Sequence, residues 1–93
     1  MTFAKHTAAE DKVTDLKLAL LALAAKVRSI PGSSSVEVLQ DRDAPANFLF
    51  IEHWASPEAH QSGGKILGKE AFASVMDAIS APPKAYSLDL VSH

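Results

Sequence analysis

The sequence contains no cysteine, and this absence removes several classes of protein at once. It excludes secreted domains stabilised by disulfides, metal sites with thiolate ligands, and cysteine nucleophiles. Basic residues are also few, since nine Lys and Arg stand against eleven Asp and Glu, for a net charge of −2 at pH 7. Without a basic block that could neutralise a run of phosphates, we expect no nucleic-acid partner.

Long apolar runs are missing as well. The longest, residues 18–25, is far shorter than the roughly 20 residues of a membrane-spanning helix. The first residues also lack the basic segment and apolar stretch of a secretory signal. We therefore expect no membrane partner and a cytoplasmic location.

What remains is the composition of an ordinary globular protein, with 93 residues, 47% hydrophobic and 22% charged. This length predicts a single domain over residues 1–93. A chain of this mass buries only about 64% of its unfolded surface, which is a thin core. Dimerisation would bury area that so short a chain cannot bury alone.

The apolar pattern predicts six elements in the order strand, helix, strand, strand, helix, strand. Strands are expected where β-branched and aromatic residues cluster or alternate, at 2–7, 36–40, 47–54 and 84–91. This order is the split βαβ pattern of ferredoxin-like domains, βαββαβ. It predicts an α+β fold, a four-stranded antiparallel sheet with helices on one face.

The first helix is expected to begin at Thr7, because Thr7 and Glu10 have the spacing of a capping box. It should end near Ser29, before Pro31-Gly32. Its buried stripe is Val13, Leu16, Leu20, Leu23, Ala24 and Val27. A second apolar surface consists of Leu18, Leu21, Ala22 and Ala25. We expect another helix or a partner chain to cover part of it, and alanine-rich helix propensity is the alternative explanation.

The second helical region begins with Ser56 as the cap and Pro57 in the first turn. We expect Gly63-Gly64 to break it. A further helix is predicted over residues 65–80, ending before Pro82-Pro83. Its predicted buried residues are Leu67, Ala71, Phe72, Val75 and Ile79.

The strand at 47–54 carries large apolar groups on both sides. Phe48, Phe50, Glu52 and Trp54 alternate with Leu49, Ile51 and His53. With helices on only one face of the sheet, the other side would expose an apolar patch that monomers seldom tolerate. We therefore predict a homodimer that packs through its sheet faces.

One stretch of sequence is similar to a known family. The segment Glu52-His53-Trp54-Ala55-Ser56-Pro57-Glu58-Ala59, preceded by Pro31-Gly32 and the strand Val36-Glu37-Val38, resembles the antibiotic biosynthesis monooxygenase family. The resemblance implies a dimeric α+β barrel with a pocket between sheet and helices in each subunit. It further implies an activity among cofactor-independent oxygenases of polyphenols and quinols, haem-degrading enzymes, and relatives of unknown activity.

The chain departs from the family pattern at one position. Members commonly carry a histidine four residues after the Glu-Ala pair, where this chain has Gly63. The haem-degrading branch also uses a tryptophan and a histidine in the second helical region, and residues 57–80 contain no tryptophan and only His60. Haem degradation is therefore the less favoured of the implied activities.

Two histidines are candidates for a catalytic base or proton shuttle, His53 and His60, because imidazole titrates near neutral pH. The candidate substrate-binding residues are Asn47, Glu52, Trp54 and Tyr86, which could hydrogen-bond or stack on an aromatic ring. Each has a structural alternative. Glu52 could serve proton transfer or pair with a neighbour to hold the fold, Trp54 could fill the core, His53 could bond across the dimer, and His60 could lie on the surface.

The remaining histidines, His6 and His93, are expected to be solvated because they lie near the termini. The four histidines lack the spacing of a metal site, so no metal ligand is predicted. No phosphate-binding loop, dinucleotide fingerprint or serine-hydrolase elbow occurs either. The sequence thus favours a monooxygenase of a small aromatic or quinol substrate that needs no cofactor. A non-catalytic ligand-binding or stress-related barrel is the alternative.

Overall fold

The structure is a computed structural model in which residues 1–89 and 91 are described. Its elements are β1 (Thr2–Thr7), α1 (Val13–Arg28), β2 (Ser33–Gln40), β3 (Asn47–Trp54), α2 (Pro57–Leu67), the 3₁₀ helix η1 (Lys69–Phe72), α3 (Ala73–Ala78) and β4 (Lys84–Ser87). The strands form one antiparallel sheet in the order β2-β3-β1-β4. This confirms the predicted ferredoxin-like α+β fold. Within the single chain the sheet is open and does not close into a barrel.

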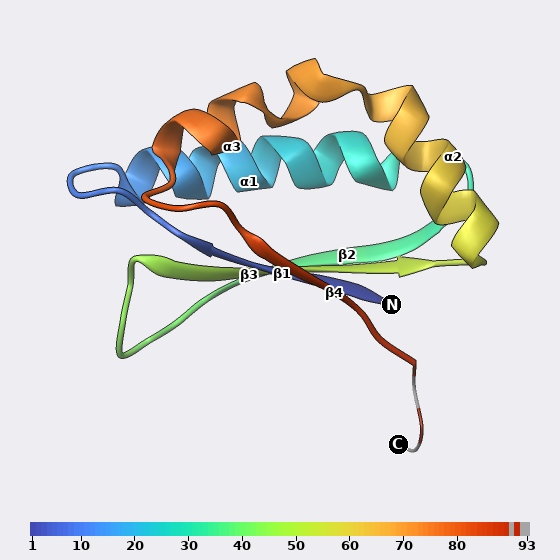
Figure 1. The fold of residues 1–93 in the computed structure, drawn as a ribbon, viewed down its shortest axis with the longest axis horizontal. Helices are drawn as coiled ribbons and strands as arrows, with labels where there is room; N and C mark the ends of the chain where they lie inside the picture. Colours follow the sequence, from blue (N-terminus) through green and yellow to red (C-terminus); the bar gives the residue numbers. More distant parts are fainter. Residues whose placement is uncertain (90, 92–93) are drawn as a thin grey trace.

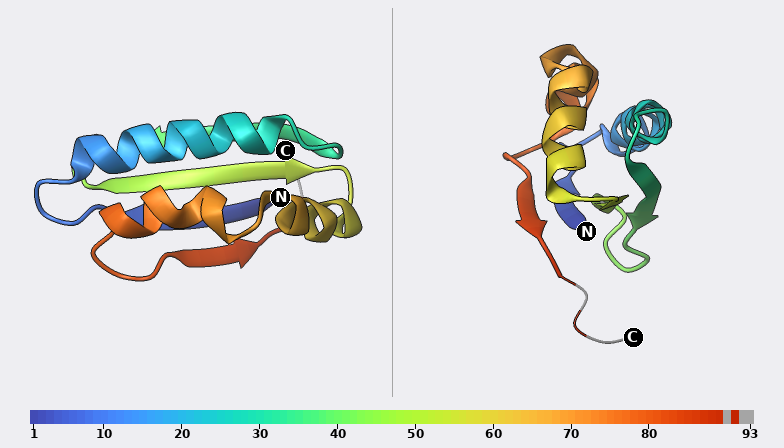
Figure 2. Two further views of the ribbon diagram at one scale, coloured as in Figure 1. Left: turned by 90° about the horizontal axis from the view of Figure 1, so that it is seen from above. Right: turned by 90° about the vertical axis from the view of Figure 1, so that its right-hand side faces the viewer.

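The helices all lie over one face of the sheet, which we call the inner face (Figure 1). Seen from above, α1 runs along the β2 and β3 side, and α3 runs along the β1 and β4 side (Figure 2). The opposite, outer face carries no helix from the described part of the chain (Figure 2). Among the described residues, no helix combines the length and apolar character needed to cross a membrane.

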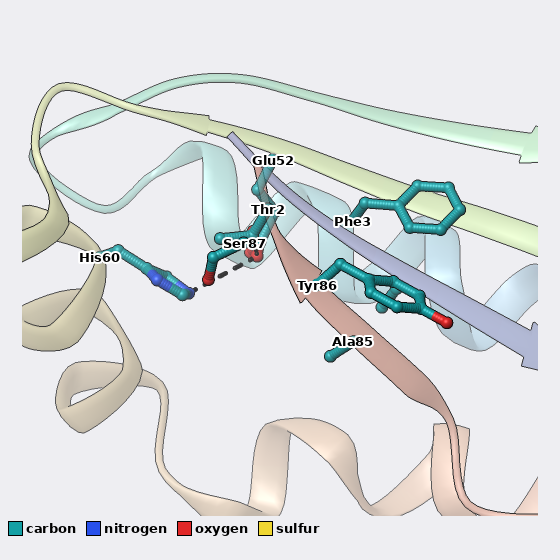
Figure 3. A pocket seen from close by; sticks show the side chains of 8 residues that line it. Thr2, Phe3, Glu52, His60, Ala85, Tyr86 and Ser87 are labelled. Atoms are coloured by element: carbon teal, nitrogen blue, oxygen red, sulfur yellow. Dashed lines mark hydrogen bonds and ion pairs between the residues drawn. The ribbon is translucent and has the colours of Figure 1, made fainter. Parts of the chain in front are cut away.

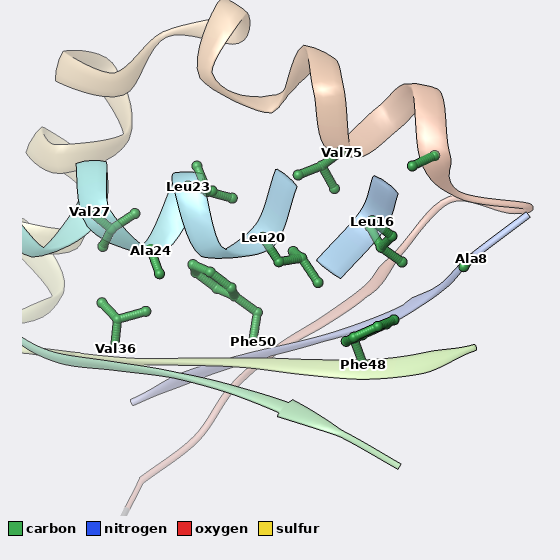
Figure 4. Close-up of a cluster of buried hydrophobic side chains, with 11 residues drawn as sticks. Ala8, Leu16, Leu20, Leu23, Ala24, Val27, Val36, Phe48, Phe50 and Val75 are labelled. Carbon is green, nitrogen blue, oxygen red and sulfur yellow. The ribbon is translucent and has the colours of Figure 1, made fainter. Parts of the chain in front are cut away.

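The core lies between α1 and the inner face (Figure 4). The stripe predicted for the first helix is confirmed, with Leu16, Leu20, Leu23, Ala24 and Val27 buried and Val13 half-buried. From β3, Phe48 and Phe50 meet this stripe, as the predicted alternation of that strand requires. The second surface of α1 is exposed in the single chain, where Leu18 and Leu21 are 60% and 46% accessible.

The first helix begins six residues later than the capping box predicted, at Val13. Thr7 stays in β1, and its hydroxyl donates to the side-chain oxygen of Asn47 across the sheet instead of capping a helix. Between strand and helix the chain turns through Asp11, which adopts a left-handed φ of 68°. A cross-strand hydrogen bond therefore replaces the predicted cap.

The break predicted at Gly63-Gly64 is also wrong, because α2 continues through both residues to Leu67. The helix ends at Gly68, whose φ of 70° is a conformation that glycine adopts without strain. The predicted helix over 65–80 is therefore divided into the end of α2, η1 and α3, although Val75 is buried as expected. The last strand is described only over Lys84–Ser87, and Leu90 and His93 lie outside the described residues.

Candidate functional site

A mostly apolar cavity of about 260 Å³ lies between the inner face and the segment from α2 to α3. We call it the inner cavity. Its sheet wall includes Ala4, Phe50 and Ala85, and its helix wall includes Leu67, Phe72 and Val75. The sheet wall leaves space because Ala4 of β1 and Ala85 of β4 are small and stand opposite each other. Three titratable side chains also line the inner cavity, namely His6, Glu52 and His60.

His60 is positioned by the start of α2. The Ser56 hydroxyl accepts a hydrogen bond from the backbone N–H of Ala59 at 3.1 Å, and Pro57 begins the helix, as predicted. One turn into the helix, His60 projects toward Glu52 (Figure 3). Its Nε2 lies 3.9 Å from Oε2 of Glu52, beyond hydrogen-bond length but within reach of an ion pair if the imidazole is protonated.

Glu52 is held from the other side by Thr2, its partner in the neighbouring strand. The Thr2 hydroxyl donates to Oε2 of Glu52 at 2.8 Å, and the carboxylate side chain is only 17% exposed. One hydroxyl donor leaves further acceptor positions on the carboxylate free. Glu52 can therefore accept a proton or a hydrogen bond from His60 or from a ligand.

Trp54 lies beside His60, with ring centroids 5.5 Å apart and planes inclined by 40°. A methyl group on Gly63 would overlap the indole ring of Trp54, so glycine lets α2 pass close to this ring. A larger side chain at position 63 would thus meet the space occupied by Trp54. The buried indole Nε1 has no hydrogen-bond partner among the described residues.

His6 is the residue that sequence reasoning missed. It is only 6% exposed, which overturns the expectation that this residue near the terminus is solvated. Burial lowers the pKa of His6 below its ordinary value of 6.5, so the imidazole is neutral near pH 7. The available signal was the alternation of β1, which places His6 on the same side as Thr2 and Ala4.

The other predicted residues lie elsewhere. His53 is on the outer face, with Nε2 3.5 Å from Oε1 of Glu37, and the Asn47 side chain accepts from Thr7 at the far end of β3. Neither lines a cavity that contains His60. Tyr86 is half-exposed and packs on Phe3, with ring centroids 5.7 Å apart. Of the predicted set, the structure therefore brings Glu52, Trp54 and His60 together at the inner cavity, whereas Tyr86 meets Glu52 and His60 only at a hollow on the β4 edge.

His60 also borders two shallower hollows at the surface. One, of about 170 Å³, lies at the β4 edge and reaches Glu52 and Tyr86 (Figure 3). The other, of about 220 Å³, is bordered by Trp54 and Ser56. His60 thus stands where the inner cavity meets the surface. Within residues 1–89 and 91, no group of three or more His, Asp or Glu side chains is placed to hold a metal ion.

Comparison with solved structures supports the same architecture. A candidate antibiotic biosynthesis monooxygenase from Caulobacter crescentus is 24% identical, with a TM-score of 0.84 over 98% of this chain and 88% of that one. PA3566 from Pseudomonas aeruginosa is 27% identical, with a TM-score of 0.77 over 94% and 88%. Rv0793 from Mycobacterium tuberculosis is 18% identical, with a TM-score of 0.79 over 98% and 96%. No curated protein matches the chain.

A family model matches the sequence directly. The model described as antibiotic biosynthesis monooxygenase covers residues 1–62. This range contains β1, α1, β2, β3 and the first half of α2, and so includes Thr2, Glu52, Trp54 and His60. The chain therefore belongs to the antibiotic biosynthesis monooxygenase family.

Proposed function

We propose that this protein is a cofactor-independent monooxygenase of a small aromatic or quinol substrate, bound in the inner cavity. The observation that carries the proposal is the Glu52–His60 pair at the mouth of an apolar cavity of about 260 Å³. Apolar walls favour a flat aromatic ring, and the pair supplies a proton acceptor at one end. A cytoplasmic location is part of the proposal, since the cysteine-free sequence has none of the disulfides common in exported small domains.

The substrate itself would supply the electrons. A phenolic hydroxyl gives its proton to His60, assisted by Glu52, and the electron-rich phenolate ring then reduces dioxygen. A C–O bond forms at a ring carbon, and the O–O bond breaks as water leaves with that carbon's hydrogen. For a naphthol the balance is naphthol plus dioxygen giving naphthoquinone plus water. The protein's task is to hold the phenolate beside oxygen and to move one proton.

A homodimer through the outer face is the second part of the proposal. Phe3, Leu49, Ile51 and Leu39 lie on this face and are half-buried or exposed in the single chain. Such a patch on a four-stranded sheet is typical of a surface that a partner covers. A second copy would present the same patch, which is the arrangement that two-fold symmetry requires.

A ligand-binding protein without catalysis is the second candidate function, favoured by the contact between Gly63 and Trp54. The indole fills the space that a histidine side chain at position 63 would need. If the family chemistry depends on that histidine, this chain keeps the cavity and lacks the reaction. The two candidates share the binding site and differ only in oxygen consumption.

Oxygen uptake by the metal-free protein with a panel of hydroquinones and naphthols distinguishes them. We expect uptake of one dioxygen per naphthol, with quinone absorbance rising in step. His60→Ala should lower the rate by about 100-fold or more, the usual effect of losing a general base. His53→Ala is the matched control, because its imidazole lies on the outer face. Uptake no faster than the uncatalysed reaction across the panel would favour the binding protein.

A further inference from the structure

The inner face carries polar groups at two separate places along β1. Glu52 and His60 lie beside Thr2, and His6 lies four residues further along the same strand. All three side chains line the inner cavity, and Ala4 and Phe50 occupy the wall between them. The cavity is therefore apolar in its middle and polar at both ends.

The spacing of these ends limits the ligand. Four residues of a strand span about 13 Å. A hydrogen bond of about 2.8 Å at each end leaves roughly 7 Å between the two ligand atoms that make them. This separation exceeds the width of one benzene ring and suits two fused rings. An apolar cavity of about 150 Å³ accepts benzene, so about 260 Å³ leaves room for the second ring.

His6 has one ring nitrogen that the described part of the chain leaves without a hydrogen bond. Its Nδ1 is buried and makes no hydrogen bond to any described residue. The neighbouring cavity wall is apolar, with Leu23 from α1, Val75 from α3 and Pro83 before β4. A buried polar group without a partner is destabilising, and a core histidine that only supports the fold is normally hydrogen-bonded. Nδ1 is closed to solvent, so a group that enters the inner cavity would reach the ring at its other nitrogen, Nε2.

We propose that His6 is the inner specificity-determining residue of this cavity, binding a hydroxyl of a fused two-ring aromatic ligand whose opposite end reaches Glu52 and His60. A neutral imidazole has one nitrogen that accepts and one that donates, so it can bind an uncharged phenol. The inference rests on the proposed function, because both concern the same cavity. It assigns to His6 recognition of the ligand, while proton removal stays with His60.

Anaerobic binding tests this role without the reaction. Calorimetry would compare 2,6-dihydroxynaphthalene with 6-methyl-2-naphthol, in which a methyl group replaces one hydroxyl and the other hydroxyl remains for Glu52 and His60. We expect the wild-type protein to bind 2,6-dihydroxynaphthalene about tenfold more tightly, the effect of one hydrogen bond. His6→Phe should abolish this preference, and His6→Gln should keep part of it. His53→Phe, the same change on the outer face, should leave the preference intact.

The wild-type protein also provides a test that needs no variant. With isotopically labelled histidine, the His6 ring resonances should shift with 2,6-dihydroxynaphthalene and much less with 6-methyl-2-naphthol. The proposal is overturned if the wild-type protein binds both ligands equally, if neither binds, or if His6→Phe folds and keeps the preference. If the preference depends on His6 but the protein consumes no oxygen, His6 binds the ligand as proposed and the monooxygenase proposal is wrong. If the protein consumes oxygen but shows no such preference, the monooxygenase proposal stands and the role of His6 is wrong.

Discussion

The two faces of the sheet use the same residue types in different ways, and the histidines show this most clearly. His6 on the inner face is 6% exposed, has no hydrogen-bond partner for Nδ1 among the described residues and lines a cavity. His53 on the outer face has a side chain that is 40% exposed and lies 3.5 Å from a Glu37 oxygen. Burial without a partner prepares an imidazole for a ligand, whereas exposure beside a carboxylate gives only a weak surface pair. Environment, not residue type, separates the two roles.

The largest expected effect concerns the outer face. Ile51→Lys would place a charge in the middle of the proposed dimer interface, where burial without a partner is strongly unfavourable. We expect self-association to weaken by about 100-fold or more, measured by sedimentation over a range of protein concentrations. The monomer should stay folded, because Ile51 is only half-buried in the single chain.

Leu18→Lys is the matched control for this experiment. Leu18 is 60% exposed on the second surface of α1, the other place where a partner chain was expected. Dimerisation that survives Ile51→Lys and is lost in Leu18→Lys would move the interface from the sheet to the helix.

A smaller effect is expected inside α2, where two adjacent glycines differ in their surroundings. Gly63→Ala would push a methyl group into the Trp54 ring, and we expect it to lower the free energy of unfolding by about 1–3 kcal/mol. Gly64→Ala meets open space in a helix interior and should raise it by about 0.5–1 kcal/mol. Urea unfolding of both variants measures the difference. Equal effects would mean that Gly63 does not set the approach of α2 to Trp54.

The smallest effect is a pH dependence from His6. Because burial lowers its pKa in the folded state, the unfolded chain takes up a proton as the pH falls below about 6.5 while the folded protein does not. Stability should therefore fall in this range, by at most about 1.4 kcal/mol per pH unit, and level off below the folded pKa. Above about pH 6.5 both states are neutral and His6 contributes nothing.

Denaturation of the wild-type protein and His6→Phe between about pH 5 and pH 8 isolates this contribution. The difference between the two proteins removes what Glu52 and His60 add, since both are present in each. A difference that stays constant with pH would contradict the effect of burial on His6.

An element can be predicted from the sequence where its local pattern and its tertiary contacts agree. The strand at 47–54 was predicted with its full bounds and both faces, because large apolar groups on alternate positions leave one register that fills the core. The buried stripe of α1 could be predicted for the same reason, since its apolar residues leave one helix face that fills the core. The capping box failed because Thr7 has a better partner in Asn47, forty residues away, which local spacing does not reveal.

The site was only partly predictable. The spacing of Ser56, Pro57 and His60 placed one histidine correctly on the first turns of α2. His6, which also lines the cavity, lies near the terminus, where side chains are usually solvated, and only the alternation of β1 indicates its burial. The helix break at Gly63-Gly64 failed because a glycine can also serve close packing, and the ring that it accommodates is nine residues earlier in the chain.

Ala4 and Ala85 give the inner cavity one further property. They face each other on neighbouring strands and form part of its wall, yet neither belongs to the fully buried core between α1 and β3. Larger side chains at these two positions would shorten or narrow the cavity by one methyl group at a time, and of the two residues only Ala4 packs against that core. If the inner cavity binds the proposed ligand, two small substitutions therefore change the size of ligand that it accepts, so that binding preference is free to diverge faster than the fold.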